Sequence, residues 1–219
     1  MAHLVWDWNG TLLDDLDLVI VATNASLATL GGPVVTVEEH RRDFRRPVPG
    51  YYAGVLGRRL SADEYRRLDR AFHDTYRSGL PGCALAADAL DALRTWPGTQ
   101  SLLSMWFHEE LLVEVTRRGL AALLDRVDGL PDTVGGGTKA AYLQAHLAAL
   151  GVPGVEAVLI GDSVDDAHAA AAVGASCVLY AGGITDADRL AATGWPVATT
   201  LVDAVSLALP LAQTYRNAI

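Results

Sequence analysis

Short apolar runs alternate with helix-forming stretches along most of the chain after residue 80. Strands are expected at residues 99–105, 155–160, 176–180 and 197–200. Helices are expected at residues 85–96, 108–118, 139–150, 165–173, 186–193 and 201–209. A further buried strand is expected at residues 3–8. Strands that alternate with helices form parallel sheets covered on both faces. The sequence therefore predicts an α/β fold with a doubly wound parallel sheet.

Residues 16–80 have a different pattern, in which no convincing strand occurs. A helix is expected at residues 16–30 and ends before Gly31-Gly32-Pro33. Two capping boxes follow, each a Ser or Thr with a Glu three residues later, at residues 36–39 and 61–64. We expect a helical domain at residues 16–80, inserted into a core domain made of residues 1–15 and 81–219.

Charge and composition exclude several classes of function. The 219 residues carry a formal net charge of −9, which disfavours sequence-independent binding to nucleic acid. The two cysteines, Cys83 and Cys177, lie far apart, so neither a disulfide framework nor a zinc site is expected. No signal-peptide pattern and no apolar run long enough for a bilayer is present. We expect a cytoplasmic monomer or homodimer without membrane or nucleic-acid partners.

Acidic residues follow two of the expected strands. Asp7 begins the segment DWNGT after the first strand, and Asp162 and Asp166 belong to GDSVDD after the strand at residues 155–160. In parallel sheets, ligands bind at the carboxyl ends of the strands. Carboxylates packed there repel one another unless a cation lies between them, and oxygen donors favour a hard ion such as Mg²⁺. Helix capping is the alternative role, and we favour it for Asp165 taken alone.

Two further residues are suited to binding an anion. Ser104 ends the expected strand at residues 99–105, where its hydroxyl and the following N–H groups face a phosphate site, although a purely structural serine is the alternative. Lys139 follows Gly135-Gly136-Gly137-Thr138 and opens an expected helix. A lysine is unfavourable in the first turn of a helix, and glycines let a ligand approach the backbone closely. Both points favour anion binding by Lys139.

Taken together, these segments resemble the four motifs of the haloacid dehalogenase (HAD) superfamily. Residues 7–14, DWNGTLLD, resemble the first motif, DxDGTLxD, and residues 158–166, VLIGDSVDD, resemble the fourth, GDSxxD. Ser104 and Lys139 resemble the second and third motifs. The helical insert resembles the C1-type cap of the phosphoglycolate phosphatase and β-phosphoglucomutase branch. The resemblance implies a Rossmann-like core and a Mg²⁺-dependent phosphatase that acts on a small phosphorylated metabolite.

The resemblance also implies a nucleophile and a metal site. Asp7 would attack phosphorus and form an aspartyl-phosphate. The ligands of Mg²⁺ would be Asp7, the backbone carbonyl of Asn9 and Asp162, with Asp166 as a further or indirect ligand.

Substrate binding is expected from the remaining motif residues and from the insert. The transferring phosphoryl group would be bound by Gly10, Thr11, Ser104 and Lys139. The insert is rich in arginine at residues 41–46 and 58–59, and a solvated helix face is the plainer reading of this pattern. We nevertheless expect Arg46 to contact an anionic substrate, because the following proline fixes the backbone and arginine binds carboxylate or phosphate at two points.

Asn9 departs from the family pattern, in which this position is usually Asp. In the family that Asp protonates the leaving oxygen and then activates water, and an amide does neither. General acid–base help is worth roughly 10²- to 10⁴-fold in rate. Three explanations stay open: a good leaving group such as an acyl phosphate, another proton donor such as His40 or His73, or a weak or inactive protein that binds a phosphorylated ligand or a protein partner. Asn9 is also a plausible turn residue, with water supplying the chemistry.

Other reactions of the superfamily fit less well. Haloacid dehalogenases need no metal and usually lack the Gly-Thr and GDSxxD pattern. Hydrolysis of a P–C bond would need a lysine in the insert for a Schiff base, and residues 16–80 contain none. A mutase would need an acid/base in the insert that the sequence does not identify. We therefore expect a phosphatase, in which Asn9→Asp raises turnover of an alkyl phosphate.

Overall fold

The computed structural model describes residues 2–131 and 138–214. Its centre is a six-stranded sheet in the order β5-β4-β1-β6-β7-β8, and every neighbouring pair is parallel. The strands are β1 (His3–Trp6), β4 (Gln100–Phe107), β5 (Arg126–Leu130), β6 (Ala157–Gly161), β7 (Ser176–Tyr180) and β8 (Val197–Ala198). The predicted fold class is confirmed. From β1 the chain continues to β4 and β5 on one side of β1, and it then crosses to β6, β7 and β8 on the other side. The strand order therefore reverses at β1, and its carboxyl end is the expected ligand site.

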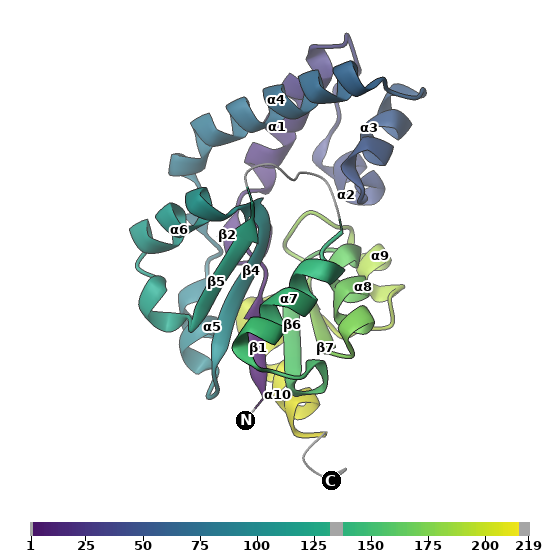
Figure 1. Ribbon diagram of the computed structural model, residues 1–219. Coiled ribbons are helices and arrows are strands. Elements are labelled where there is room, and N and C mark those ends of the chain that lie inside the picture. Colours follow the sequence, from purple (N-terminus) through teal and green to yellow (C-terminus); the bar gives the residue numbers. More distant parts are fainter. Residues whose placement is uncertain (1, 132–137, 215–219) are drawn as a thin grey trace.

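Helices cover both faces of the sheet (Figure 1). One face packs against α5 (Ala89–Thr95), α6 (His108–Arg117) and α10 (Leu201–Thr214). The other packs against α7 (Ala140–Leu150), α8 (Val164–Val173) and α9 (Ala187–Ala191). Successive side chains of a strand point into the two cores in turn: Leu4 and Trp6 of β1 lie in the first core, and Val5 lies in the second. All three side chains are fully buried, and each such burial stabilises the fold by about 1.5–3 kcal/mol.

The first four helices after β1 form a separate helical segment above the carboxyl edge of the sheet (Figure 1). They are α1 (Leu16–Ala28), α2 (Val37–Asp43), α3 (Val48–Leu56) and α4 (Ala62–Gly79). Both expected capping boxes form, at the starts of α2 and α4. The segment has its own small core, which includes Leu27, Tyr51, Tyr52 and Leu68. As expected, no strand lies within residues 16–80, all of which the structure describes.

Some elements differ from the sequence prediction. The strand β5 was not expected, because its residues RVDGL are mostly half-buried at the sheet edge and form no apolar run. The helix α3 was not expected either, yet its Pro49 lies in the first turn, where proline is tolerated. The helix predicted from residue 85 begins only at Ala89, because Ala84–Leu85 form the strand β3, which pairs antiparallel with β2 (Leu13–Asp14). This two-stranded ribbon joins the helical segment to the core.

Three short 3₁₀ helices complete the described elements: η1 (Leu80–Gly82), η2 (Ala121–Leu123) and η3 (Gly154–Glu156). None of the helices in the described part of the chain has both the length and the apolar character needed to cross a bilayer.

Candidate active site

Three carboxylates meet at the carboxyl edge of the sheet. Asp7 directly follows β1, Asp162 directly follows β6, and Asp166 lies in the first turn of α8. One carboxylate oxygen from each lies within 4.8 Å of the others, and all three side chains are buried. The backbone N–H of Asp7 donates to the carbonyl of Ile160 at 2.8 Å, which extends the β1–β6 pairing to the first carboxylate. Parallel pairing of β1 and β6 thus brings the two sequence motifs together.

The loop after Asp7 is shaped to hold Asp162. Gly10 has φ +71°, and a side chain there would collide with the Asp162 carboxylate. The Thr11 hydroxyl donates to Asp162 Oδ1 at 3.0 Å, and the Ile184 N–H donates to Asp162 Oδ2 at 2.6 Å. Thr11 is fully buried, so its contact in this structure is with a carboxylate of the cluster.

Lys139 places its ammonium among these carboxylates. Its Nζ lies 2.7 Å from Asp7 Oδ1 and 2.5 Å from Asp166 Oδ1, and the side chain is 2% exposed. Its backbone N–H donates to Asp165 Oδ2 at 2.9 Å, which ties the start of α7 to the fourth motif. Lys139 is the only lysine in the sequence, a signal of its role that sequence reasoning overlooked. The glycines at positions 135–137 lie outside the described residues.

The cluster is short of positive charge. Three carboxylates and one ammonium carry a net charge of −2 when all are ionised. Burial raises the pKa of Asp7 to about 7, and the charge of Asp166 adds to this rise while Lys139 opposes it. Burial and the charge of Asp7 raise the pKa of Asp162 well above its usual range. Burial alone would lower the pKa of Lys139, but Asp166 and Asp7 together raise it, so the ammonium stays charged. Oxygen ligands with excess negative charge suit a hard divalent cation.

The side chain of Asn9 is held by hydrogen bonds on both ends. Its Nδ2 donates to Asp15 Oδ2 at 2.8 Å and to the Tyr76 hydroxyl at 2.7 Å, while its Oδ1 accepts from Ser104 Oγ at 3.2 Å. The Tyr76 hydroxyl donates to the same Asp15 oxygen at 2.5 Å. Asp15 Oδ1 accepts from the Gly10 N–H at 2.7 Å. Asn9 therefore belongs to a polar cluster built around a buried carboxylate.

Asp15 and Tyr76 were missed by the sequence analysis. The motif comparison matched Asp14, which is exposed, whereas Asp15 is only 1% exposed and its pKa is raised by burial. Nothing in the pair Asp14-Asp15 indicates which carboxylate points inward. Tyr76 comes from α4, far along the chain, so only the packing of the helical segment on the core brings it to Asn9.

Ser104 contacts Asn9, whereas Arg46 contacts the start of α8. Ser104 is fully buried, and its Oγ accepts from the Trp106 N–H at 3.0 Å as well as contacting Asn9. Arg46 Nε lies 3.8 Å from Asp165 Oδ2, an ion pair between the helical segment and the start of α8. Asp165 thus contacts both Arg46 and the backbone of Lys139.

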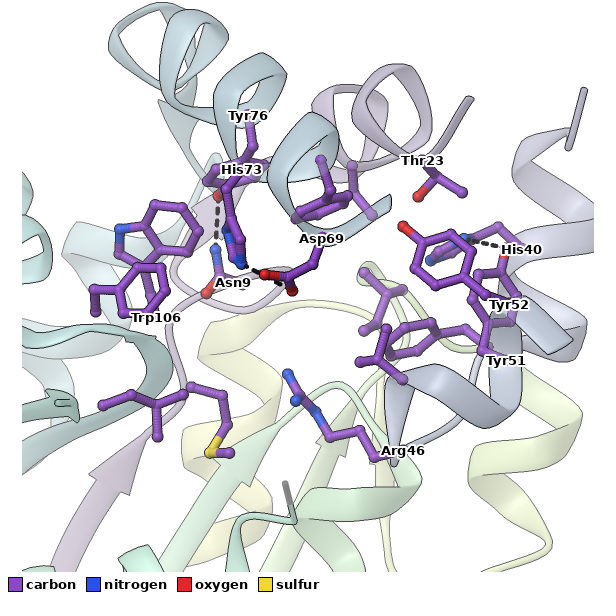
Figure 2. A pocket seen from close by; sticks show the side chains of 18 of the residues that line it. Asn9, Thr23, His40, Arg46, Tyr51, Tyr52, Asp69, His73, Tyr76 and Trp106 are labelled. Atoms are coloured by element: carbon purple, nitrogen blue, oxygen red, sulfur yellow. Dashed lines mark hydrogen bonds and ion pairs between the residues drawn. The ribbon is translucent and has the colours of Figure 1, made fainter. Parts of the chain in front are cut away.

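A cavity of about 140 Å³ lies between the helical segment and the edge of the sheet, with Asn9 and Arg46 in its wall (Figure 2). His73 also lines it, and its Nε2 lies 3.4 Å from Asp69 Oδ1. Figure 2 shows His73 close to Asn9 and Tyr76, whereas His40 lies at the far end. His40 Nδ1 lies 2.9 Å from the Tyr51 hydroxyl, with which it shares a hydrogen bond. Burial lowers the pKa of His40 to about 4. Of the two histidines considered as proton donors, only His73 lies near Asn9.

Comparisons with known proteins agree with this architecture. Residues 136–206 match the family model described as HAD-hydrolase-like, and no curated protein matches the chain. A predicted phosphoglycolate phosphatase from Haemophilus somnus 129pt has a TM-score of 0.74 at 16% identity, over 95% of this chain and 98% of that chain. A predicted phosphatase from Clostridium acetobutylicum has a TM-score of 0.81 at 14% identity, over 95% of this chain and 98% of that chain. A hydrolase from Pseudomonas syringae has a TM-score of 0.79 at 19% identity, over 97% of this chain and 100% of that chain.

Proposed function

We propose that this chain, whose fold and partial family match support the resemblance to the HAD hydrolases, is a metal-dependent phosphatase that forms an aspartyl-phosphate on Asp7. One observation carries the proposal: the only lysine of the chain is buried against Asp7 and Asp166 at the carboxyl edge of the sheet. A cluster with no chemical role would have little reason to bury three carboxylates around one ammonium, since burying charge is costly. The substrate class is a small phosphorylated metabolite.

The residues present fit a divalent cation with oxygen ligands, and the family resemblance points to Mg²⁺. Asp7, Asp162 and Asp166 would each supply one carboxylate oxygen, and the Asn9 backbone carbonyl would supply another. The net charge of −2 on the cluster with Lys139 matches one divalent ion. When bound, such an ion would orient the phosphoryl group and neutralise its charge.

The protein's own groups would position and bind the phosphoryl group. An Asp7 oxygen would form a bond to phosphorus while the bond to the leaving oxygen breaks, and water would then release phosphate from Asp7. Lys139 would oppose the rise in the pKa of Asp7 that burial causes. It would also bind a phosphoryl oxygen, assisted by Ser104 and the loop at Gly10 and Thr11. Phosphoryl transfer depends mainly on such positioning and charge neutralisation.

The helical segment would act as a cap. We assign residues 1–15 and 81–219 to the core domain and residues 16–80 to the cap. The cap contributes most of the cavity wall, including Arg46, which would contact an anionic group of the substrate. Substrate choice would therefore depend on the cap.

A second candidate function is a HAD-fold protein that binds a phosphorylated ligand or a protein partner with little or no turnover. The observation that favours it is Asn9, whose amide is held by Asp15, Tyr76 and Ser104 and cannot transfer a proton. The buried pairing of Asp7 with Lys139 favours the phosphatase, because a binding protein needs no nucleophile beside a cation site.

The test is release of inorganic phosphate from acetyl phosphate, p-nitrophenyl phosphate and a set of sugar phosphates. Each assay is run with Mg²⁺ and with EDTA, and Asp7→Asn serves as the blank. Mg²⁺-dependent release that disappears in Asp7→Asn would support the proposal. Release no greater than the blank from every compound would favour the binding protein.

A further inference from the structure

The cavity beside Asn9 is walled mainly by aromatic rings. All three phenylalanines of the chain line it, together with rings that include Tyr52, Tyr76 and Trp106. Phe72 and Tyr76 are stacked with an interplanar angle of 12° and ring centroids 5.7 Å apart. Tyr76 and Trp106 have centroids 4.7 Å apart, and Trp106 and Phe107 5.3 Å. Rings from α4 thus continue into the end of β4 and form one wall.

The charged side chains in this wall already have partners. Asp69 lies against His73, and Arg46 lies against Asp165 outside the cavity. A sugar phosphate would bring several hydroxyl groups into contact with ring faces and edges, and a hydroxyl buried without a hydrogen bond is costly. A flat apolar group gains from the same wall by stacking and edge contacts. Three buried ring nitrogens of the wall, His40 Nε2, His73 Nδ1 and Trp106 Nε1, have no hydrogen-bond partner among the described residues. The remaining ring faces favour an aromatic ring over a sugar, whose hydroxyl groups they would not pair.

The size of the cavity suits one ring. Its volume is about 140 Å³. An apolar cavity of roughly 150 Å³ in another protein binds benzene.

Asn9 supplies an independent argument about the leaving group. It lies in the cavity wall two residues from Asp7, at the point where the substrate would pass from its ring to its phosphoryl group. Its amide cannot protonate a leaving oxygen. A phenol has a pKa of about 10, as in tyrosine, whereas an alcohol ionises near the ~16 of water. A phenolate therefore leaves without a proton far more readily than an alkoxide.

We propose that the substrate is an aryl phosphate, the phosphate monoester of a single-ring phenol, with its ring in the aromatic cavity and its phosphoryl group at Asp7. This inference rests on the proposed phosphatase function and narrows it. An Asp7 oxygen bonds to phosphorus, and the bond between phosphorus and the ring oxygen breaks. The phenolate leaves with the electron pair and takes a proton from solvent, and water then releases phosphate from Asp7.

Four small phosphate esters distinguish the contribution of the ring from that of the leaving group. Phenyl phosphate has both the ring and the good leaving group, benzyl phosphate has the ring with an alkyl oxygen, acetyl phosphate has a good leaving group without a ring, and glucose 6-phosphate has neither. We expect phenyl phosphate to have the highest kcat/KM. Benzyl phosphate should have a kcat/KM at least 100-fold lower than phenyl phosphate, because kcat/KM reports the step in which the leaving oxygen departs. Acetyl phosphate should have a KM at least tenfold higher than phenyl phosphate.

The outcomes distinguish this inference from the function on which it rests. Asp7-dependent release from acetyl phosphate or glucose 6-phosphate with a higher kcat/KM than phenyl phosphate would overturn the aryl substrate and leave the phosphatase standing. Equal kcat/KM for benzyl and phenyl phosphate would also overturn it, since a proton donor such as His73 would then be acting. No Asp7-dependent release from any ester would reject the phosphatase itself.

A variant of the wall tests the cavity directly. Phe72→Leu keeps an apolar side chain but removes a ring, and we expect KM for phenyl phosphate to rise about 3- to 10-fold, more than KM for acetyl phosphate. Val113→Ala, at an exposed position of α6, is the matched control and should change neither value. Equal changes in KM for both esters in Phe72→Leu would show that the ring does not lie in this cavity.

Discussion

The side-chain amide of Asn9 donates a 2.8 Å hydrogen bond to the buried carboxylate of Asp15. An aspartate at position 9 would instead oppose Asp15 with a second carboxylate, and two such groups can both ionise only at a large electrostatic cost. The asparagine is thus matched to its surroundings by this hydrogen bond.

Asn9→Asp should raise kcat/KM for benzyl phosphate by about 10²-fold, because it restores a proton donor beside the leaving oxygen. The carboxylate of Asp15 would help to keep that donor protonated. For phenyl phosphate the gain in kcat/KM should be much smaller, since a phenolate needs no proton to leave. Steady-state kinetics on the two esters measure this difference. A variant no faster than the wild type on benzyl phosphate would show that the missing acid does not limit turnover.

The double variant Asn9→Asp/Asp15→Asn exchanges the amide and the carboxylate. The single variant should lower the melting temperature, and the exchange should recover at least half of that loss, because a hydrogen-bonded amide–carboxylate pair is restored. Thermal unfolding of the two single variants and the double variant gives the coupling. Strictly additive losses would mean that the two side chains act independently.

The core of the fold was predictable because its strands are apolar and bounded by clear turns. Residues 176–180 were assigned without error, and the region at residues 165–173 differs from α8 by one residue. The edge strand β5 was not predictable, since Arg126 and Asp128 alternate with apolar residues that are only half-buried. A short edge strand whose residues are mostly half-buried has no clear apolar run, so the sequence does not predict it.

The site was predictable where it depends on strand ends, and not where it depends on packing between the helical segment and the core. Asp7, Asp162 and Lys139 follow from the position of strands and helices, and the structure brings them together. The contact of Tyr76 with Asn9 depends on how α4 lies over the sheet, which no local pattern encodes. The same holds for the aromatic cavity, whose rings lie far apart in the sequence.

Lys139→Met should lower kcat by at least 10²-fold and destabilise the metal-free protein by about 3–5 kcal/mol. The rate falls because one preorganised positive group is lost from the phosphoryl site. The stability falls because Asp7 and Asp166 are left buried without their cation. Release of inorganic phosphate measures kcat. Chemical unfolding in EDTA and then with Mg²⁺ measures the stability, and Mg²⁺ should recover part of its loss. An unchanged unfolding midpoint in EDTA would contradict the buried ion pair.

Mg²⁺ affinity should rise as pH rises through about 7. Burial raises the pKa of Asp7 to about 7, so in the metal-free protein this carboxyl is largely protonated below that pH and ionised above it. The ion binds the ionised form, and binding therefore releases protons. Calorimetric titrations at pH 6 and pH 8, in two buffers each, measure the affinity and the proton release. Asp162→Asn should abolish binding, whereas Asp203→Asn, an exposed control, should not. Equal affinity at the two pH values would contradict the prediction.

Arg46→Ala should raise KM for phenyl phosphate about tenfold with a smaller change in kcat. Arg46 lines the cavity and reaches Asp165, so its loss removes both a positive charge near the bound phosphate and a link between the helical segment and the core. Arg59→Ala, at an exposed position of the same segment, is the control. Saturation kinetics separate the two constants, and an unchanged KM would exclude Arg46 from substrate binding.

A buried chain of hydrogen bonds in the core should make the fold sensitive to acid. His3 Nε2 lies 2.7 Å from Ser101 Oγ, which lies 2.7 Å from His146 Nε2, and His146 Nδ1 lies 2.7 Å from Asp128 Oδ2. Burial, aided by the charge of His146, lowers the pKa of His3 to about 4, and burial lowers that of His146 as well.

The folded pKa of His3 is below its unfolded value of about 6.5, so the unfolded chain binds more protons between pH 6.5 and 4. The stability that depends on neutral His3 is therefore fully present above pH 6.5 and is lost as pH falls to 4, by up to about 3 kcal/mol. The buried carboxylates of the active site titrate in an overlapping range with the opposite sign, so the contribution of His3 must be isolated by a variant. His3→Gln keeps hydrogen-bonding groups but does not titrate. The difference in unfolding free energy between wild type and His3→Gln, measured by urea at pH 7.5 and pH 4.5, should shrink or reverse at the lower pH. A difference that stays constant across this range would mean that His3 has the same pKa in the folded and unfolded chains.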